Sequence, residues 1–135
     1  MTDRLIVLAI AAGIGLLLLG LFELYRRRWT EPPERLSVED FGLELMEGCC
    51  AFIVFTSPSC RPCKAALRIV SDAAANAEGV TEVVAIDATE HHEVANRYEV
   101  RTIPTVFLIT ASGHVIKRWR EVPELDDARS TLASI

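Results

Sequence analysis

The sequence lacks the short motifs that bind the common redox cofactors. Neither a Gly-x-Gly-x-x-Gly loop nor a Cys-x-x-Cys-His element occurs in its 135 residues. These motifs mark dinucleotide binding and haem attachment, so the sequence shows no site for flavin, nicotinamide or haem. Internal repeats and low-complexity tracts are also absent. We therefore expect a protein without a bound cofactor.

Positive charge is scarce beyond the N-terminal region. From Glu31 onward there are 10 Lys and Arg against 17 Asp and Glu, a net charge of −7 (10 − 17). Such an acidic surface repels a phosphate backbone. We therefore expect no nucleic acid among the partners.

Cysteine is too sparse for an ordinary zinc site. Zinc needs four ligands, which usually come from two Cys-x-x-Cys pairs. The sequence has one such pair, Cys60 and Cys63, and its other cysteines, Cys49 and Cys50, are adjacent. They begin a predicted strand whose other end leads to Cys60, about 20 Å away, so we interpret them as small apolar residues. No metal is expected.

Charge is absent from Leu5 to Phe22, a run of 18 residues dominated by Leu, Ile, Ala and Gly. As a helix this run is about 27 Å long, close to the ~30 Å hydrocarbon core of a bilayer. A cleaved signal peptide is the rival interpretation, and it expects a charged segment before the run and a small-x-small site after it. Here the basic cluster Arg26–Arg28 follows the run, without an Ala-x-Ala site. This favours an uncleaved, single-pass anchor in the lipid bilayer.

The same arginines predict the orientation in the cell membrane. The positive-inside rule places the flank with Arg26–Arg28, and all that follows it, in the cytoplasm. The alternative is a domain that faces the outside. Within the apolar run, Ala9 and Gly13 form a small-xxx-small pair of the kind that supports a weak dimer through the anchor.

The chain divides into three parts. Residues 1–29 form the transmembrane anchor and its basic flank, residues 30–35 form a linker stiffened by Pro32 and Pro33, and residues 36–135 form one domain. About 100 residues are enough for a single hydrophobic core.

Within this domain the hydrophobic pattern predicts alternating strands and helices. The apolar run before Cys60 indicates a buried strand, and the stretch after it indicates a helix. The expected elements are a helix over Val38–Glu47 capped by Ser37, strands over Cys50–Thr56 and Val80–Ile86, a helix over Lys64–Ala77, a helix from Thr89 to Tyr98 with His91 and His92 facing solvent, a hairpin of Thr105–Ile109 and His114–Trp119, and a last helix from Pro123. The first two strands, joined by a helix, should be parallel.

The Cys60-Arg61-Pro62-Cys63 motif lies at a strand-to-helix junction. A cysteine at a helix N-terminus is stabilised as a thiolate by unpaired N–H groups and the helix dipole. Cys60 is therefore the predicted nucleophile, and Cys63, one turn inside, the predicted resolving thiol. Arg61 and Lys64 add positive charge, and Pro62 fixes the first turn.

At these residues the chain resembles the thioredoxin family. The resemblance covers roughly residues 36–135 and includes Cys-x-Pro-Cys followed by Lys64, a strand ending in Asp87, and Ile103-Pro104-Thr105. It implies an α/β fold with a thioredoxin-like mixed sheet flanked by helices. It also implies that Pro104 is cis and packs against the disulfide. The implied activity is thiol–disulfide exchange with protein disulfide or dithiol substrates and an upstream dithiol donor.

The sequence departs from the family pattern at four positions. Aligned without gaps, the family's buried acid falls on Val54, its partnering lysine on Val83, the tryptophan before the first cysteine on Ser59, and a groove glycine on Glu121. These departures favour a narrower range of partners. Val54 and Glu121, together with Arg61, also leave a second hypothesis open, a non-catalytic adaptor of the same fold that docks a membrane partner.

The predicted orientation can be tested with reporters fused after Ile135. If Arg26–Arg28 hold the cytoplasmic side, a phosphatase fusion should be inactive and a cytosolic fluorescent reporter active. Reversal of the three arginine charges should weaken or invert this preference. An active phosphatase in the unaltered chain would place the domain outside.

Overall fold

The computed structural model describes residues 2–30 and 33–135, with side chains up to Arg27 in the first range. The chain forms two compact units, Met1–Glu31 and Pro32–Ile135. The linker expected over residues 30–35 lies partly outside the described residues, because positions 31 and 32 fall between the two ranges.

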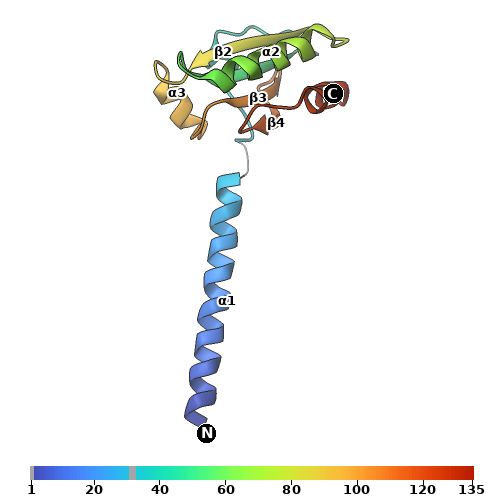
Figure 1. Ribbon diagram of the computed structural model, residues 1–135. Coiled ribbons are helices and arrows are strands. Elements are labelled where there is room, and N and C mark those ends of the chain that lie inside the picture. Colours follow the sequence, from blue (N-terminus) through green and yellow to red (C-terminus); the bar gives the residue numbers. More distant parts are fainter. Residues whose placement is uncertain (1, 31–32) are drawn as a thin grey trace. The chain divides into compact units, whose positions relative to one another are not determined.

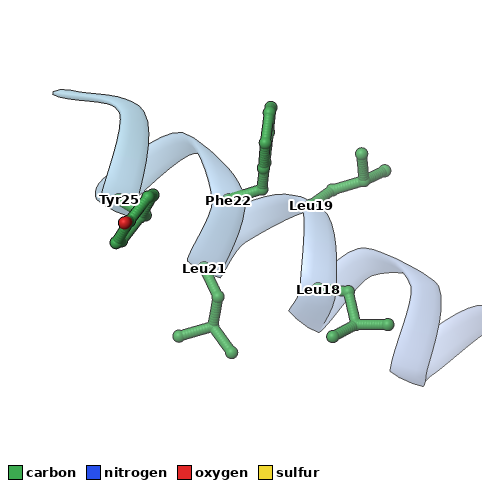
Figure 2. A pocket seen from close by; sticks show the side chains of 5 residues that line it. All are labelled: Leu18, Leu19, Leu21, Phe22 and Tyr25. Carbon is green, nitrogen blue, oxygen red and sulfur yellow. The ribbon is translucent and has the colours of Figure 1, made fainter. Parts of the chain in front are cut away.

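The first unit is one long helix, α1 (Thr2–Thr30). An 18-residue window within its stretch Thr2–Arg27 has a mean hydropathy of 2.8, so this stretch is long and apolar enough to cross a membrane, although a signal sequence would meet the same criterion. A shallow hollow on this helix is lined by Leu18, Leu19, Leu21, Phe22 and Tyr25, whose side chains extend away from the helix (Figure 2). All five belong to α1, so the hollow is part of the outer surface of one helix and not an enclosed site.

The second unit is built on a four-stranded sheet with the order β2-β1-β3-β4 (Figure 1). Strand β1 (Cys50–Thr56) pairs in parallel with β2 (Thr81–Asp87) and antiparallel with β3 (Thr105–Thr110). Strand β3 turns back into β4 (Val115–Trp119), again antiparallel. The predicted parallel pair, the hairpin and the mixed α/β class are thereby confirmed.

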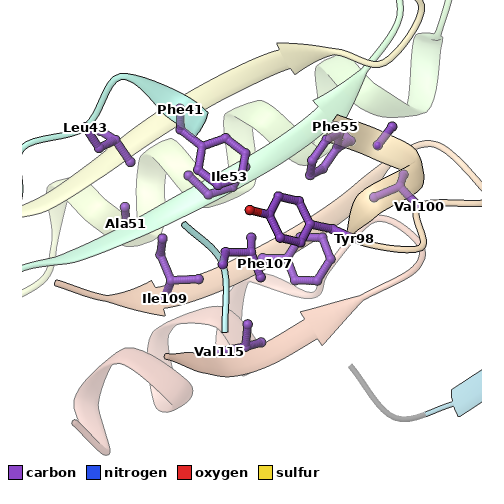
Figure 3. Close-up of a cluster of buried hydrophobic side chains, with 12 residues drawn as sticks. Phe41, Leu43, Ala51, Ile53, Phe55, Tyr98, Val100, Phe107, Ile109 and Val115 are labelled. Atoms are coloured by element: carbon purple, nitrogen blue, oxygen red, sulfur yellow. The ribbon is translucent and has the colours of Figure 1, made fainter. Parts of the chain in front are cut away.

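Helices cover both faces of this sheet and create two apolar layers. On one face, α2 (Arg61–Ala75) and α4 (Leu125–Ala133) pack over Phe52, Val54 and Val106. On the other face, the short 3₁₀ helix η1 (Val38–Phe41) and α3 (His92–Arg97) enclose a cluster rich in aromatic rings (Figure 3). Its labelled members include Phe41, Phe55, Tyr98 and Phe107, with Phe55 and Phe107 in edge-to-face contact at 5.9 Å between centroids.

The hairpin turn is packed against the segment that leads into the domain. The Leu36 amide donates to the Gly113 carbonyl at 2.8 Å, and the Val115 amide donates to Glu34. Gly113 has φ of 78°, and a Cβ there would lie 2.0 Å from the Leu36 carbonyl oxygen. An isolated antiparallel bridge joins Arg35 to His114 beside this contact.

The ten-residue helix expected over Val38–Glu47 is wrong. Only η1 forms, and Ser37 makes no side-chain cap. Gly42 ends it with φ of 64°, a left-handed conformation that suits glycine. Beyond it, buried and exposed residues alternate around Leu43, as they do in an extended chain. Every second side chain therefore packs toward the sheet.

Two other predicted helix starts are also wrong. Helix α3 begins at His92, since Thr89 instead closes a turn in which its amide and hydroxyl both donate to Asp87. Helix α4 begins at Leu125 and not at Pro123. The expected exposure of His91 and His92 is confirmed.

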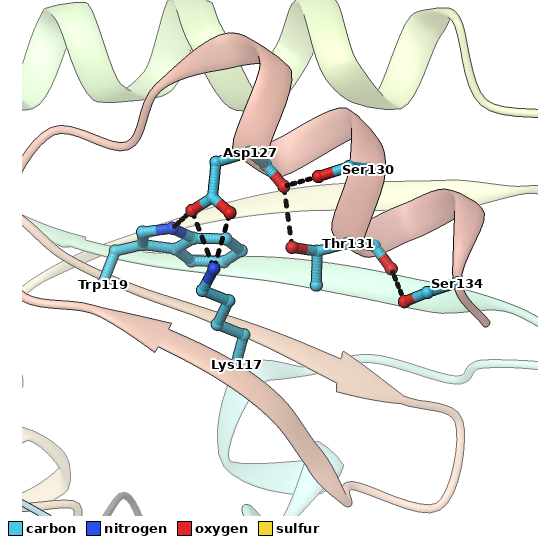
Figure 4. A network of polar contacts seen from close by, with 6 residues as sticks. All are labelled: Lys117, Trp119, Asp127, Ser130, Thr131 and Ser134. Carbon is cyan, nitrogen blue, oxygen red and sulfur yellow. Dashed lines mark hydrogen bonds and ion pairs between the residues drawn. The ribbon is translucent and has the colours of Figure 1, made fainter.

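Polar contacts fasten the outer elements to the sheet. Asp127 of α4 accepts from Lys117 Nζ at 2.6 Å and from Trp119 Nε1 at 2.6 Å, both on edge strand β4 (Figure 4). The Lys117 ammonium, and then the indole N–H, hold the pKa of Asp127 below its usual value. The Trp119 ring is buried behind this contact.

The buried Tyr98 joins α3 to η1. Its hydroxyl accepts the Ser37 amide and donates to Asp40, which also pairs with Arg97 at 2.7 Å. The Tyr98 hydroxyl, and then Arg97, hold the pKa of Asp40 below its usual value. One phenol at the end of α3 therefore satisfies two polar groups of the η1 segment.

Replacing Tyr98 should destabilise this corner. Tyr98→Phe leaves the Ser37 amide without its partner and should cost about 1–2 kcal/mol of unfolding free energy, whereas Arg97→Gln, which removes an exposed ion pair, should cost less. Because the folded-state pKa of Asp40 is depressed, its contribution is present above the unfolded-state pKa and is lost as pH falls through the folded one. In Tyr98→Phe the free energy of unfolding should therefore also fall less steeply as the pH is lowered. Denaturant titrations of the full chain in mild detergent at several pH values measure both effects, and equal stability of Tyr98→Phe and the unaltered chain would contradict the assignment.

Candidate active site

Cys60 and Cys63 form a disulfide at the beginning of α2. Strand β1 ends at Thr56, and the following loop brings Cys60 to the N-cap position with an extended backbone. Its Sγ accepts the Cys63 amide at 3.2 Å, and the two Cα atoms lie 5.3 Å apart. The sequence motif and the helix start thus coincide as predicted.

The two cysteines differ in exposure. Cys60 is partly exposed, whereas Cys63 is completely buried on the inner side of α2. Arg61, Pro62 and Lys64 are exposed on the first turn, which contains no acidic residue. An attacking or attacked partner can therefore reach one sulfur atom only.

The Ile103–Pro104 segment lies at the same end of the sheet as the disulfide. Phe55 pairs with Thr105, so the residues just after β1 and those just before β3 are neighbours across the sheet. The Ile103–Pro104 bond is cis, as the family resemblance implies. Pro104 is buried, while 37% of Ile103 is exposed. The predicted residues are therefore gathered at one end of the fold.

Backbone contacts that sequence reasoning missed hold this end together. The Cys60 amide donates to the Ser57 carbonyl at 3.2 Å, and the Ala88 amide donates to Thr56 at 2.9 Å. The Thr105 hydroxyl donates to the Thr102 carbonyl at 2.6 Å. The only sequence signal for these contacts is that Ser57 and the proline after it often form turns. Every residue has a backbone carbonyl group, so the sequence does not show which carbonyl accepts a hydrogen bond.

The interior behind Cys63 is apolar. Val54 is fully buried and lies opposite Ala85 and Val106 in the sheet. Apart from Tyr98 and Trp119, which carry one polar atom each, and the cysteines, Thr105 is the only buried residue with a polar or charged side chain among those described. Burial in such surroundings disfavours a charged thiolate, which opposes deprotonation of Cys63.

The remaining cysteines occupy the other end of β1. Cys50 pairs with Thr110, six residues along the strand from Thr56. It is buried, and this burial, and then the neighbouring Cys49, raise the pKa of its thiol. Both are free thiols in the structure, remote from the disulfide along the strand.

Comparison with known proteins agrees with this geometry. The family model described as Thioredoxin matches residues 33–134. The chain belongs to the thioredoxin family. It is 35% identical over 61 residues to thioredoxin 1 of Nostoc sp., covering 45% of this chain and 57% of that protein. It is also 38% identical over 58 residues to protein disulfide isomerase-like 1-3 of Arabidopsis thaliana, covering 43% and 10% of the two chains.

Solved structures show the same fold. A mutant thioredoxin from Halobacterium salinarum superimposes with a TM-score of 0.60 at 21% identity, over 74% of this chain and 85% of that one. The thioredoxin of Fasciola hepatica gives 0.54 at 23% identity, over 65% and 82%. The chain spans a tenth and just over half of the two curated relatives named above. A disulfide at a helix start within a thioredoxin domain is a redox-type site, typical of thiol–disulfide oxidoreductases.

The apolar interior predicts slow release of substrate from Cys60. With Val54 in place, Cys63 should stay protonated at neutral pH, so mixed disulfides should accumulate and resolve faster as pH rises. Val54→Asp should speed resolution while lowering stability, because it buries a carboxyl group. Val54→Asn is the control, since it brings polarity without a base. Quenched-flow trapping of the Cys60 adduct measures the rate, and equal rates in the unaltered chain and Val54→Asp would contradict this account.

Proposed function

We propose that the protein is a membrane-anchored thiol–disulfide oxidoreductase that reduces disulfides in other proteins. The observation that carries the proposal is the disulfide between a partly exposed Cys60 and a buried Cys63 at the start of α2. In this role Cys60 is the nucleophile and Cys63 the resolving thiol. Arg61, Pro62, Lys64, Ile103 and Pro104 shape the site.

The reaction proceeds through two exchanges of sulfur bonds. The Cys60 thiolate attacks one sulfur of the substrate disulfide, forms a mixed disulfide and releases the other substrate sulfur as a thiolate. Cys63 then loses its proton to solvent or to the departing thiolate and attacks Cys60 Sγ. The Cys60–Cys63 bond closes and the second substrate thiol leaves. Two electrons pass from the protein to the substrate, and an upstream dithiol donor must return them.

The start of α2 favours the first of these steps. Its free backbone N–H groups and dipole stabilise negative charge on Cys60. The guanidinium of Arg61 and the ammonium of Lys64 add to this stabilisation. Attack by Cys60 is therefore the faster step and resolution by Cys63 the slower one.

Residues 5–22 act in this proposal as a single-pass anchor in the cell membrane. Support comes from the length and hydropathy of α1. The arginines that follow the apolar run favour a cytoplasmic domain. Thiols in that compartment are kept reduced, which suits a reductase.

A second candidate is a non-catalytic adaptor of the same fold. It is favoured by the exposed Glu121, at the position of a groove glycine in the family pattern, and by the apolar residue at position 54. Such an adaptor would bind a membrane partner at the same end of the sheet without exchanging electrons with it.

Reduction of insulin by the full chain in detergent separates the two. An oxidoreductase should precipitate insulin with dithiothreitol as donor, and Cys60→Ser should lose this activity. Cys63→Ser should retain the first exchange and hold substrate as a mixed disulfide. In Cys63→Ser the thiolate absorbance should titrate below the ordinary thiol pKa of ~8.5. Insulin reduction that is no faster than with Cys60→Ser would support the adaptor.

A further inference from the structure

The first two turns of α2 carry a row of positive charge beside the disulfide. Arg61, Lys64 and Arg68 recur at intervals of three and four, which places them on one face of the helix, and all three are exposed. The next charged residue on this face is Asp72, one turn farther from Cys60. The ion pairs found among the described residues involve none of these three cations.

This arrangement is unfavourable for the helix itself. Cations in a first turn oppose the helix dipole, and Lys64 and Arg68, four residues apart, repel each other. Most helices place acidic residues there, whereas α2 has none in its first turn. When a helix beside a reactive disulfide has cations where acidic residues would stabilise it, we expect those cations to serve binding or catalysis.

The row also contrasts with the rest of the domain. From Glu31 onward the net charge is −7 (10 − 17). The other loops at the disulfide end contribute both signs, with Arg101 and Arg120 among the cations and Glu90 and Glu121 among the anions. The face of α2 is therefore the part of this end with charge of one sign.

We propose that Arg61, Lys64 and Arg68 select protein disulfides whose cysteine is flanked by acidic residues on the side that lies along α2. The inference rests on the proposed function and adds a substrate class to it. Where a polypeptide whose sulfur reaches Cys60 lies along the exposed first turns of α2, its carboxylates would be attracted to the three cations. Charges at the rim of a contact act mainly on association rate and on salt dependence.

Single-turnover reduction tests this selection. The pre-reduced full chain, in nanodiscs of zwitterionic lipid, is mixed with disulfide peptides that differ only in flanking Asp, Gly or Lys residues. The uncharged reference is 2-hydroxyethyl disulfide, which reports the intrinsic reactivity of Cys60. The measured quantity is the rate constant for each peptide divided by that for the reference.

The Asp-flanked peptide should react about three- to tenfold faster than the Gly-flanked one at low salt, as expected for a few exposed charge pairs. This ratio should approach one in about 0.5 M salt. The double variant Lys64→Gln/Arg68→Gln should lose most of the preference, and Lys64→Glu/Arg68→Glu should reverse it towards the Lys-flanked peptide. The charge-matched control Arg35→Gln/Arg129→Gln, which changes no residue of α2, should keep it.

Two results would overturn the proposal. The first is equal reference-corrected rates for the three peptides in the unaltered chain. The second is a preference that persists in Lys64→Glu/Arg68→Glu. Failure of the proposed function has a different signature, because the chain would then fail to reduce even 2-hydroxyethyl disulfide.

Discussion

Strand β1 has both faces covered, and the rest of the domain depends on this. Residues Ala51–Phe55 are entirely buried, since α2 and α4 pack on one face and η1 and α3 on the other. A strand in this position can satisfy its backbone only through neighbouring strands, here β2 and β3. Its direction then fixes where the chain emerges, and with it the position of Cys60 at the start of α2.

The same constraint explains which parts of the fold are predictable from the sequence. A strand buried on both faces is a continuous apolar run, so the bounds of β1 are predicted without error. The helix after the disulfide is also recognisable, because its apolar positions repeat at helical spacing, although it starts three residues earlier than expected. The Val38–Glu47 segment is mispredicted because its leucines fit a helix locally. Only the sheet beside it shows that Leu43 is buried as part of an extended chain.

The candidate site divides in the same way. Its cysteines, Pro104 and the basic first turn are visible in the sequence, because each depends on a residue type at a fixed spacing. The contacts that position them, such as the Ser57 carbonyl with the Cys60 amide, use backbone groups that every residue has. The Tyr98 hydroxyl forms hydrogen bonds with Ser37 and Asp40, which lie about sixty residues away in the sequence, and no local sequence pattern predicts such a pairing.

The contact between Leu36 and the hairpin turn holds the start of the domain away from the disulfide. Glu34 and Leu36 are bonded to Val115 and Gly113, at the end of the sheet where β3 turns into β4. The disulfide lies at the other end, roughly 20 Å away by the length of a seven-residue strand. Residues 34–36 therefore lie at the end of this unit opposite the sulfur atoms. Loosening of these two backbone hydrogen bonds would therefore disturb the end of the sheet that is remote from the redox pair.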